Sequence, residues 1–517
     1  MFKDHPKGLI PAALSNMGER FGYYIMNAVL LLFLVSKFGI SDQWSGVIYS
    51  VFYALIYVLS LVGGIIADRK NNYKGVIMTG LIVMAAGYIL LSIPITSTSD
   101  NISWLLPFTC VSLLLIAFGN GLFKGNLQAI VGQMYDDLET EAAKKGPEAL
   151  RIAKTKRDAG FQIFYVFINI GGLIAPFVAP LLRSWWLGKN GFTYNAGLPE
   201  LCHKVIKGIS MSADELANLT KWTTEVGGTV ATPEFCQNYL EVFNTGVHYS
   251  FIASVVAMLI SLIIFISTRH LYPEPPKKVQ MEAQSYTAEE KKAMASEIKQ
   301  RMYALFAVLG VAVFFWFSFH QNGQSLSIFA RDFIKTDAIP PEIWQAVNPF
   351  FVIVLTPIIM VIFSNLARKG KSISTPKKIV YGMFIAALAY VFLIAISVSY
   401  GYPSGTEFRA LDADTQAAMK AGPWVLIVTY FFLTVAELFI SPLGLSFVSK
   451  VAPKHLQGLC QGLWLSATAI GNLLIWLGPV MYNKWPLWIC WTVFAAVCVI
   501  SMTIMLSMVK WLERVTK

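Results

Sequence analysis

The stretch NMGERFGYYIMNAVLLLFLV, residues 16–35, is apolar enough to cross a lipid bilayer, yet it carries a glutamate next to an arginine. A hydrocarbon core roughly 30 Å thick requires about 20 such residues in a helix. Comparable runs recur along the 517-residue chain, of which 56% is hydrophobic and 14% charged. Because lipid offers no hydrogen bonds, long apolar runs indicate helices and not the alternating strands of a barrel. The sequence therefore predicts an all-α polytopic membrane protein.

About twelve membrane-spanning helices are expected, six in each half of the chain. Their predicted ranges are 11–36, 44–67, 75–95, 104–133, 159–184, 246–268, 300–330, 346–367, 378–400, 422–450, 457–482 and 486–510.

The expected domains are two six-helix bundles, residues 1–268 and 300–517, joined by a cytoplasmic linker at 269–299. The linker opens with prolines and continues as an amphipathic helix that enters the seventh span. Within the first bundle, the segment 185–245 is unusually long and has no clear period, which is compatible with a small cap. Two six-helix bundles that bracket a central site are typical of many transporters.

Lysine and arginine cluster in alternate gaps between the predicted helices, for example in DRKNNYK (68–74) and ARKGKSISTPKK (367–378). The positive-inside rule places these gaps and both termini in the cytoplasm. The net charge of +11 follows from this bias and does not require a nucleic-acid partner. We expect a multi-pass protein of the plasma membrane, which is the inner membrane in a bacterium.

Four charged residues stand out within the predicted helices: Glu19, Arg20, Lys124 and Glu437. Charges within a membrane bundle are costly and usually mark the path of a substrate or an ion, although a purely structural ion-pair network is the alternative. Three of them lie in the first half of the chain and one in the second. This split suits a ligand with a carboxylate at one end and an ammonium at the other, such as a short peptide.

Five further motifs occur in order along the chain. They are GGIIADR (63–69), GNGLFKGN (119–126), FYVFINIGGLIAP (164–176), AELFISPLGLSFVSKVAP (436–453) and GLWLSATAIGN (462–472). Together with ERFGYY (19–24), they resemble the proton-dependent oligopeptide transporter family, also called POT or PTR2, of the major facilitator superfamily. The resemblance runs from the first helix to the eleventh and implies the major facilitator fold.

The resemblance also implies a set of substrate contacts. Arg20 and Lys124 would hold the peptide carboxylate, the first through a planar pair of donors and the second as a point charge. Glu437, with Asn169 and Asn348, would receive the amino terminus and the first carbonyl. The residues implied to line the pocket are Tyr23, Tyr24, Tyr57, Trp316, Ser441 and Trp464. For any single tyrosine or tryptophan, ordinary helix packing is the competing interpretation.

Two pairs are expected to control the cytoplasmic gate. In major facilitator proteins the motif that holds Asp68 and Arg69 makes an ion pair between the two halves. Arg157 and Asp158, at the entry of the fifth helix, are expected to act at the same face.

The sequence departs from the family at three positions. Typical members carry a glutamate three residues before the ER pair, where this chain has Asn16; they have an arginine at Asn27 and an acid at His320. Asn27 and His320 would replace an ion pair at the outer gate by an uncharged or histidine-based contact. Because asparagine does not titrate, proton coupling must use another group, and the candidates are Glu19, Glu437 and His320.

We therefore expect a secondary active transporter that imports di- and tripeptides by alternating access, driven by the proton gradient, without a metal or cofactor, and functional as a monomer. The alternatives are an uncoupled or exchange carrier of peptides, a carrier of an anion or modified peptide, and a substrate sensor with the same fold. An enzyme is disfavoured, because the sequence has no HExxH or GxSxG motif.

Six cysteines are too scattered for a metal site. Four lie in apolar helices as packing residues, whereas Cys202 and Cys236 both fall in the segment 185–245. These two are either a disulfide, if that segment faces an oxidising compartment, or free thiols.

Overall fold

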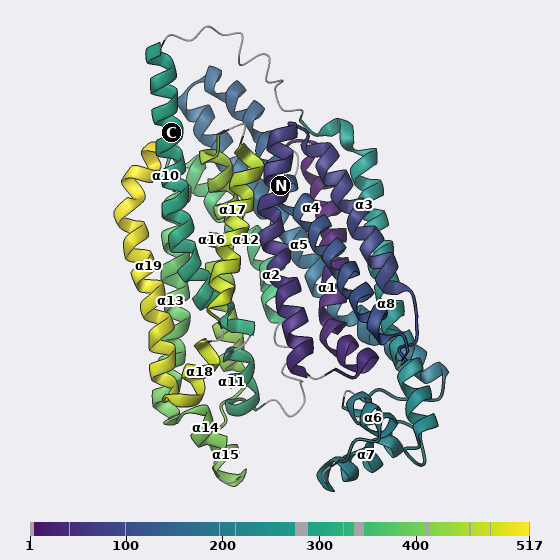
Figure 1. Cartoon of the computed structure of the whole chain (residues 1–517). Coiled ribbons are helices and arrows are strands. Elements are labelled where there is room, and N and C mark those ends of the chain that lie inside the picture. Colours follow the sequence, from purple (N-terminus) through teal and green to yellow (C-terminus); the bar gives the residue numbers. More distant parts are fainter. Residues whose placement is uncertain are drawn as a thin grey trace.

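The structure is a computed structural model that describes residues 5–515 except 41, 99, 196, 212, 274–287, 324, 336–345, 410, 412, 454–455 and 476. At a few helical positions, Asn27 among them, only the backbone is described. The described residues are almost entirely helical (Figure 1).

The first half of the chain forms one bundle and a small group of helices at one end of it. Its elements are α1 (Leu9–Phe38), α2 (Asp42–Lys70), α3 (Tyr73–Ser92), α4 (Ile102–Lys145), α5 (Pro147–Lys189), α6 (Leu198–Lys207), α7 (Ala213–Glu225), α8 (Pro233–Ser267) and the 3₁₀ turn η1 (Arg269–Leu271). In this N-half, α1 packs between α5 and α8, and α4 packs against α2 and α3.

The second half forms the other bundle. Its elements are α10 (Ala288–Phe319), the 3₁₀ turn η2 (His320–Gly323), α11 (Ser325–Phe333), α12 (Val347–Arg368), α13 (Thr375–Tyr400), α14 (Gly405–Arg409), α15 (Ala413–Met419), α16 (Trp424–Val451), α17 (Gln457–Leu473), α18 (Leu477–Lys484) and α19 (Leu487–Val515). In this C-half, α13 packs against α16 and α19, and α10 packs against α17 and α19.

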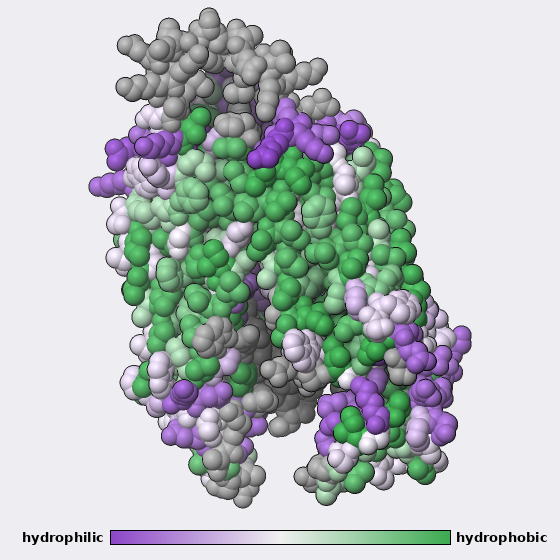
Figure 2. All heavy atoms as spheres, viewed as in Figure 1, coloured by the Kyte–Doolittle hydropathy of each residue, from purple (hydrophilic) through white to green (hydrophobic). Residues whose placement is uncertain are grey.

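Among the described residues, eleven helices are long and apolar enough to span a membrane. They correspond to the second to twelfth predicted spans. The first predicted span is α1, a 30-residue helix in the middle of the N-half. Apolar side chains cover the flanks of both bundles, and polar side chains gather at the two ends (Figure 2).

Two predicted spans are not continuous helices, which corrects the expectation for 300–330 and 457–482. The first breaks at η2, between α10 and α11, and the second breaks between α17 and α18. The two breaks lie together, because the Gln321 amide donates to the carbonyl of Ile475 at 3.1 Å. A side chain from one break thus satisfies a backbone carbonyl at the other.

The segment 185–245 is more ordered than its sequence suggests. The helices α5 and α8 extend into it from both sides, and α6 and α7 lie between them. We call α6, α7 and the loops between residues 190 and 232 the outer subdomain. The end of the molecule that carries it is the outer end, and the end that carries both termini is the inner end (Figure 1).

The two halves touch closely near the inner end, where α2 and α17 meet through glycine. A Cβ built on Gly64 would lie 2.2 Å from the carbonyl oxygen of Gly458, and one on Gly462 would lie 2.8 Å from that of Ser60. Small residues allow helix backbones to approach in this way. At the outer end, by contrast, a hollow separates the halves (Figure 2). The molecule is therefore closed at the inner end and open at the outer end.

Candidate functional site

The first group of site residues lies on α1 and α4, in the interior of the N-half. Glu19 accepts hydrogen bonds from Nε and Nη2 of Arg20, both at 2.6 Å, and a third from the amide of Asn120. Glu19 and Arg20 are 1% and 3% exposed. This bidentate pair is what we expect if Glu19 and Arg20 form a purely structural ion pair, which is the alternative to a substrate or ion path. It leaves Nη1 of Arg20 without a bond to Glu19.

Tyrosines surround this pair and the neighbouring lysine. The guanidinium carbon of Arg20 lies 4.6 Å from the ring centre of Tyr23, and Nζ of Lys124 lies 4.5 Å from that of Tyr57. Tyr23 and Tyr24 pack edge to face at 5.3 Å. The hydroxyl of Tyr23 is buried and has no hydrogen-bond partner among the described residues. It is a free polar group in the wall of the site.

The second group is centred on Glu437 of α16, which is 6% exposed. Its carboxylate accepts a hydrogen bond from the amide of Asn348 on α12, at 2.7 Å, and another from the hydroxyl of Tyr165 on α5. Asn348 also donates to Thr434 at 3.0 Å. Because α5 belongs to the N-half, the contact with Tyr165 joins the two halves at the centre of the molecule.

Lys124 and Glu437 have one property in common. Within the described part of the chain, neither has an oppositely charged group within ion-pair distance, although Glu437 is buried and Lys124 is partly buried. Buried charges are normally paired, because desolvation is costly. The site thus presents an uncompensated cation on the N-half and an uncompensated anion on the C-half.

Aromatic side chains of the C-half complete the surroundings. Trp316 is 5% exposed and stacks on His320 with ring centres 4.9 Å apart. His320 in turn hydrogen-bonds through Nδ1 to Asn472, at the break after α17. Trp464 is buried against Gly444, where a Cβ would lie 2.2 Å from its ring. Ser441, one turn after Glu437 on α16, is buried as well.

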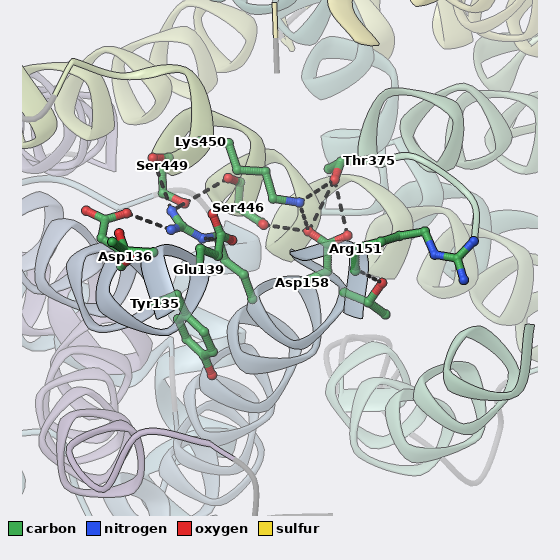
Figure 3. Close-up of polar contacts among 12 residues, drawn as sticks. Tyr135, Asp136, Glu139, Arg151, Asp158, Thr375, Ser446, Ser449 and Lys450 are labelled. Atoms are coloured by element: carbon green, nitrogen blue, oxygen red, sulfur yellow. Dashed lines mark hydrogen bonds and ion pairs between the residues drawn. The ribbon is translucent and has the colours of Figure 1, made fainter. Parts of the chain in front are cut away.

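The inner end holds a dense polar cluster around Asp158 of α5 (Figure 3). Its carboxylate accepts from Nζ of Lys450 at 2.7 Å and from Nζ of Lys378 at 2.9 Å. The hydroxyls of Ser446, at 2.6 Å, and of Thr375, at 3.1 Å, donate to it too. All four donors come from α13 and α16 of the C-half. We call Asp158 and these four residues the Asp158 cluster.

Arg157, the preceding residue, joins the two halves as well. Within the N-half it bonds Glu139 at 2.8 Å and Asp136 at 2.6 Å. Its third nitrogen donates to the hydroxyl of Ser449 on α16, at 3.2 Å. Arg151, one and a half turns earlier, donates to the carbonyl of Gly370 at 3.0 Å. One face of α5 therefore carries three residues that hold the C-half.

Asp68 makes an interdomain contact with the backbone of α17. Its carboxylate accepts from the backbone N–H groups of Gly458, at 3.0 Å, and Leu459, at 2.7 Å, in the first turn of α17. A carboxylate at a helix N-terminus is favoured by the free N–H groups and the helix dipole. Arg69 is exposed at the end of α2.

Not every predicted residue joins these groups. The amide of Asn169 donates to the carbonyl of Tyr165 in its own helix, at 2.9 Å. The predicted contact between Asn27 and His320 lies outside the described side chains. Asn16 is buried one turn before Glu19, so the position of the missing acid does face the interior.

Sequence reasoning missed several contributors to these groups, among them Tyr165, Asn120, Lys378 and Lys450. The two lysines were counted only as evidence for orientation, because they stand in basic segments at helix ends. Tyr165 and Asn120 lie within the quoted motifs, one turn from Asn169 and Lys124, and this spacing was the available signal.

Comparison with known proteins identifies the family. A model of the POT family, PTR2, matches residues 74–288 and 277–487. The chain belongs to the POT family. The expected resemblance and the expected absence of an enzymatic role are thereby confirmed, because this is a family of transporters.

Curated POT relatives match over most of this chain. Dipeptide and tripeptide permease B of Salmonella typhimurium is 28% identical over 472 residues, which cover 88% of this chain and 83% of the permease. Dipeptide and tripeptide permease A of Escherichia coli is 27% identical over 479 residues, which cover 91% and 83%.

Solved structures agree on the fold. A crystal structure of a peptide transporter POT in complex with alafosfalin has a TM-score of 0.59 at 22% identity and covers 100% of this chain and 97% of that one. A POT family transporter in complex with 5-aminolevulinic acid has a TM-score of 0.58 at 20% identity, with 100% and 98% covered. The major facilitator fold is confirmed, and the protein is a multi-pass membrane protein.

Proposed function

We propose that this POT protein carries di- and tripeptides across the membrane by alternating access, coupled to protons. The observation that carries the proposal is the pair of uncompensated buried charges, Lys124 on the N-half and Glu437 on the C-half. A zwitterionic peptide supplies a carboxylate for one and an ammonium for the other. The names of the curated relatives, dipeptide and tripeptide permeases, support the same substrate class.

Binding and closure are linked in this mechanism. The peptide carboxylate binds Lys124 and the remaining nitrogen of Arg20, and the amino terminus binds Glu437 and Asn348. Both ends are satisfied only when the halves approach, so binding favours closure of the outer end. The Asp158 cluster and the Asp68 contact then separate as the inner end opens. Because one chain supplies all of these groups, a monomer is sufficient.

Glu437 is the site that we assign to proton coupling. Both carboxylate oxygens of Glu19 accept hydrogen bonds from the Arg20 guanidinium. Glu437 has only the neutral donors Tyr165 and Asn348. Among the described residues, Glu437 is therefore the carboxylate of the site that has no cationic partner. His320 is already engaged by Asn472.

The cellular setting follows from the charge distribution. The basic loops and both termini lie at the inner end, which we assign to the cytoplasm under the positive-inside rule. The outer subdomain then faces the outside of the plasma membrane, or the periplasm of a bacterium. One proton moving through about 100 mV supplies about 2.3 kcal/mol, enough for accumulation of order fifty-fold.

The test is uptake of labelled dialanine into proteoliposomes, with and without an inward proton gradient. Accumulation only with the gradient supports the full proposal, and equilibration that ignores the gradient leaves a peptide carrier without coupling. Dialanine blocked at either terminus should be taken up poorly. Equal uptake of blocked and free dialanine would rule out the bridging mechanism.

Uncoupled peptide carriage is the second candidate, and a specific observation favours it. Asn16 replaces the usual acid, and the adjacent Glu19 is already held in a bidentate pair. The response of uptake to the gradient distinguishes the two functions directly.

A further inference from the structure

The outer subdomain brings two cysteines together in its core. Cys202 of α6 and Cys236 of α8 are both 0% exposed. Because α6 packs against α8, both thiols lie in one buried core. The other four cysteines lie in the membrane-spanning helices α4, α17 and α19. Cys202 and Cys236 are therefore the only two cysteines of the chain in or beside the outer subdomain.

Their surroundings hold the pair in place. Leu198 and Leu201 of α6 are buried against α8, and Tyr239 lies one turn after Cys236 with 0% exposure. The hydroxyl of Tyr239 accepts from the backbone N–H of Asn195 at 3.2 Å, which fixes the loop that leads into α6. A thiol is only a weak hydrogen-bond donor, so the proximity of Cys202 and Cys236 adds little to the stability of the fold while both stay reduced.

We propose that Cys202 and Cys236 form a disulfide that fastens α6 to α8. The inference rests on the membrane orientation proposed above, because that orientation places the outer subdomain in an oxidising compartment. A disulfide here closes a long loop through α7, and such a bond stabilises mainly by restricting the unfolded segment.

The chemistry requires an external oxidant, and its class is the disulfide form of a thiol oxidoreductase. The thiolate of one cysteine attacks the disulfide of the oxidant to give a mixed disulfide and a released thiol. The thiolate of the other cysteine then displaces the oxidant. One sulfur–sulfur bond forms, two protons leave the thiols, and the oxidant is reduced to its dithiol. Since both thiols are buried once α6 has docked, the bond forms during folding.

The bond fixes more than α6 itself, because α6 caps α1. His203, next to Cys202, donates through Nε2 to the carbonyl of Ser36 at 2.7 Å. Nζ of Lys207 donates to the carbonyl of Gly39 at 3.1 Å. Both carbonyls belong to the C-terminal end of α1, the helix that carries Glu19 and Arg20. The disulfide therefore holds the rim of the outer hollow to the helix that lines the site.

The test is a thiol count on the full-length protein, alkylated under denaturing conditions at the moment of lysis and measured by intact mass. The chain has six cysteines, so we expect four adducts without reductant and six with it. The unalkylated, unreduced protein should be about 2 Da lighter than the reduced one, since two hydrogens leave. A peptide digest should contain the cross-linked pair. Six adducts without reductant would overturn the proposal.

Matched variants assign the bond. In Cys236→Ser, the five remaining cysteines should all react without reductant. In Cys110→Ser, a change at a membrane-spanning cysteine, three should react before reduction and five after it. A bond that persists in Cys236→Ser would belong to another pair and would contradict the assignment.

A separate label tests the orientation on which the inference rests. Ser210 is exposed in the loop after α6, and we introduce Ser210→Cys into a Cys202→Ser/Cys236→Ser background. A membrane-impermeant maleimide should label it on intact cells. Absence of labelling would show that the outer subdomain does not face the oxidising compartment, and would overturn the inference. Failed dialanine uptake by a protein that holds the bond would count only against the proposed function.

Discussion

The inner end and the central site differ in how their charged side chains are paired. At the inner end, the Asp158 carboxylate accepts from two lysines and two hydroxyls of the other half, so that its capacity is filled. At the centre, Lys124 of the N-half and Glu437 of the C-half have no oppositely charged partner among the described residues. One interface is satisfied by the protein alone, and the other leaves charge to be satisfied by something that enters.

This difference suggests what each region contributes to transport. In the proposed mechanism, the saturated cluster keeps the empty protein closed at the inner end and prevents leakage. An unsaturated site makes the outward state incomplete until a zwitterion binds. A ligand shifts a conformational equilibrium only as far as it binds one state better than the other. The bridge from Lys124 to Glu437 supplies that preference, and the Asp158 cluster opposes it.

The largest effect is expected from Asp158→Asn. This change leaves the ammonium groups of Lys378 and Lys450, 3% and 8% exposed as side chains, without their carboxylate. Removing one partner of a buried pair costs about 3–5 kcal/mol. We expect the empty protein to shift to the state that is open at the inner end, measured as a longer distance between spin labels on α5 and α13. Asp137→Asn, at an exposed position of α4, is the control. An unchanged distance would show that the Asp158 cluster does not hold the two halves together at the inner end.

Glu437→Gln and Lys124→Gln are expected to have the next largest effects. Each removes one charged partner of the peptide, and a hydrogen bond to a charged group contributes about 1.5–3 kcal/mol, which corresponds to about 10- to 100-fold. Glu437→Gln should reduce uptake of free dialanine but not the already low uptake of N-acetylated dialanine. Lys124→Gln should show the same pattern with the C-amidated peptide.

Glu234→Gln, at an exposed position at the outer end of α8, controls for the loss of a carboxylate. If each variant reduced the uptake of free and blocked dialanine by the same factor, then Lys124 and Glu437 would not bind the peptide termini. In Glu437→Gln the response to the proton gradient should also disappear.

Gly64→Ala is expected to act on closure of the inner end. Its Cβ would lie 2.2 Å from the carbonyl oxygen of Gly458, so α2 and α17 must separate. Overpacking of this kind costs about 1–3 kcal/mol. The same spin labels should report an opened inner end. Gly310→Ala, on α10, meets nothing within 4 Å and should leave the distance as it is. Equal behaviour of the two variants would show that the glycine contact does not set closure.

The smallest effect concerns the cap of α6 on α1 and its dependence on pH. Burial, and then the neighbouring Lys207, lower the pKa of His203, against the opposing effect of its bond to Ser36. The undocked state thus binds more protons below the usual pKa of about 6.5. Docking is at full strength above that pH and weakens as pH falls through it. The protection of the α6 amides, measured as their exchange rate relative to the intrinsic rate at each pH, should fall below about pH 6.5. In His203→Gln this protection should be independent of pH there.

Most of the fold was predictable from the sequence, because a bilayer demands long apolar runs that stand out from any background. The breaks at His320 and after Leu473 were not predictable in this way. The short polar run at residues 320–325 did not by itself indicate a break, and hydropathy continues through the second break. The two breaks are joined by tertiary contacts, such as that of Gln321 with Ile475. The helices α6 and α7 were missed since short amphipathic segments resemble loops in composition.

The sequence predicted the charged residues of the central site better than those of the Asp158 cluster. Arg20, Lys124 and Glu437 stood out because charge is rare in such helices. Lys378 and Lys450 did not, since lysines at cytoplasmic helix ends are ordinary. Only the fold brings Asp158 within reach of both. The assigned roles of Asn169 and Asn27 stay predictions, as do the ligand contacts of the aromatic residues.

The glycine contact between α2 and α17 also bears on how fast the protein can turn over. Gly64 and Gly458 meet backbone to backbone, so no side chain has to find a new rotamer when they part. The activation barrier for opening the inner end then arises mainly from rehydrating the carboxylate and ammonium groups of the Asp158 cluster. In the proposed mechanism, we therefore expect turnover to be limited more by the re-entry of water around the polar groups of the inner end than by repacking along the whole length of the two bundles.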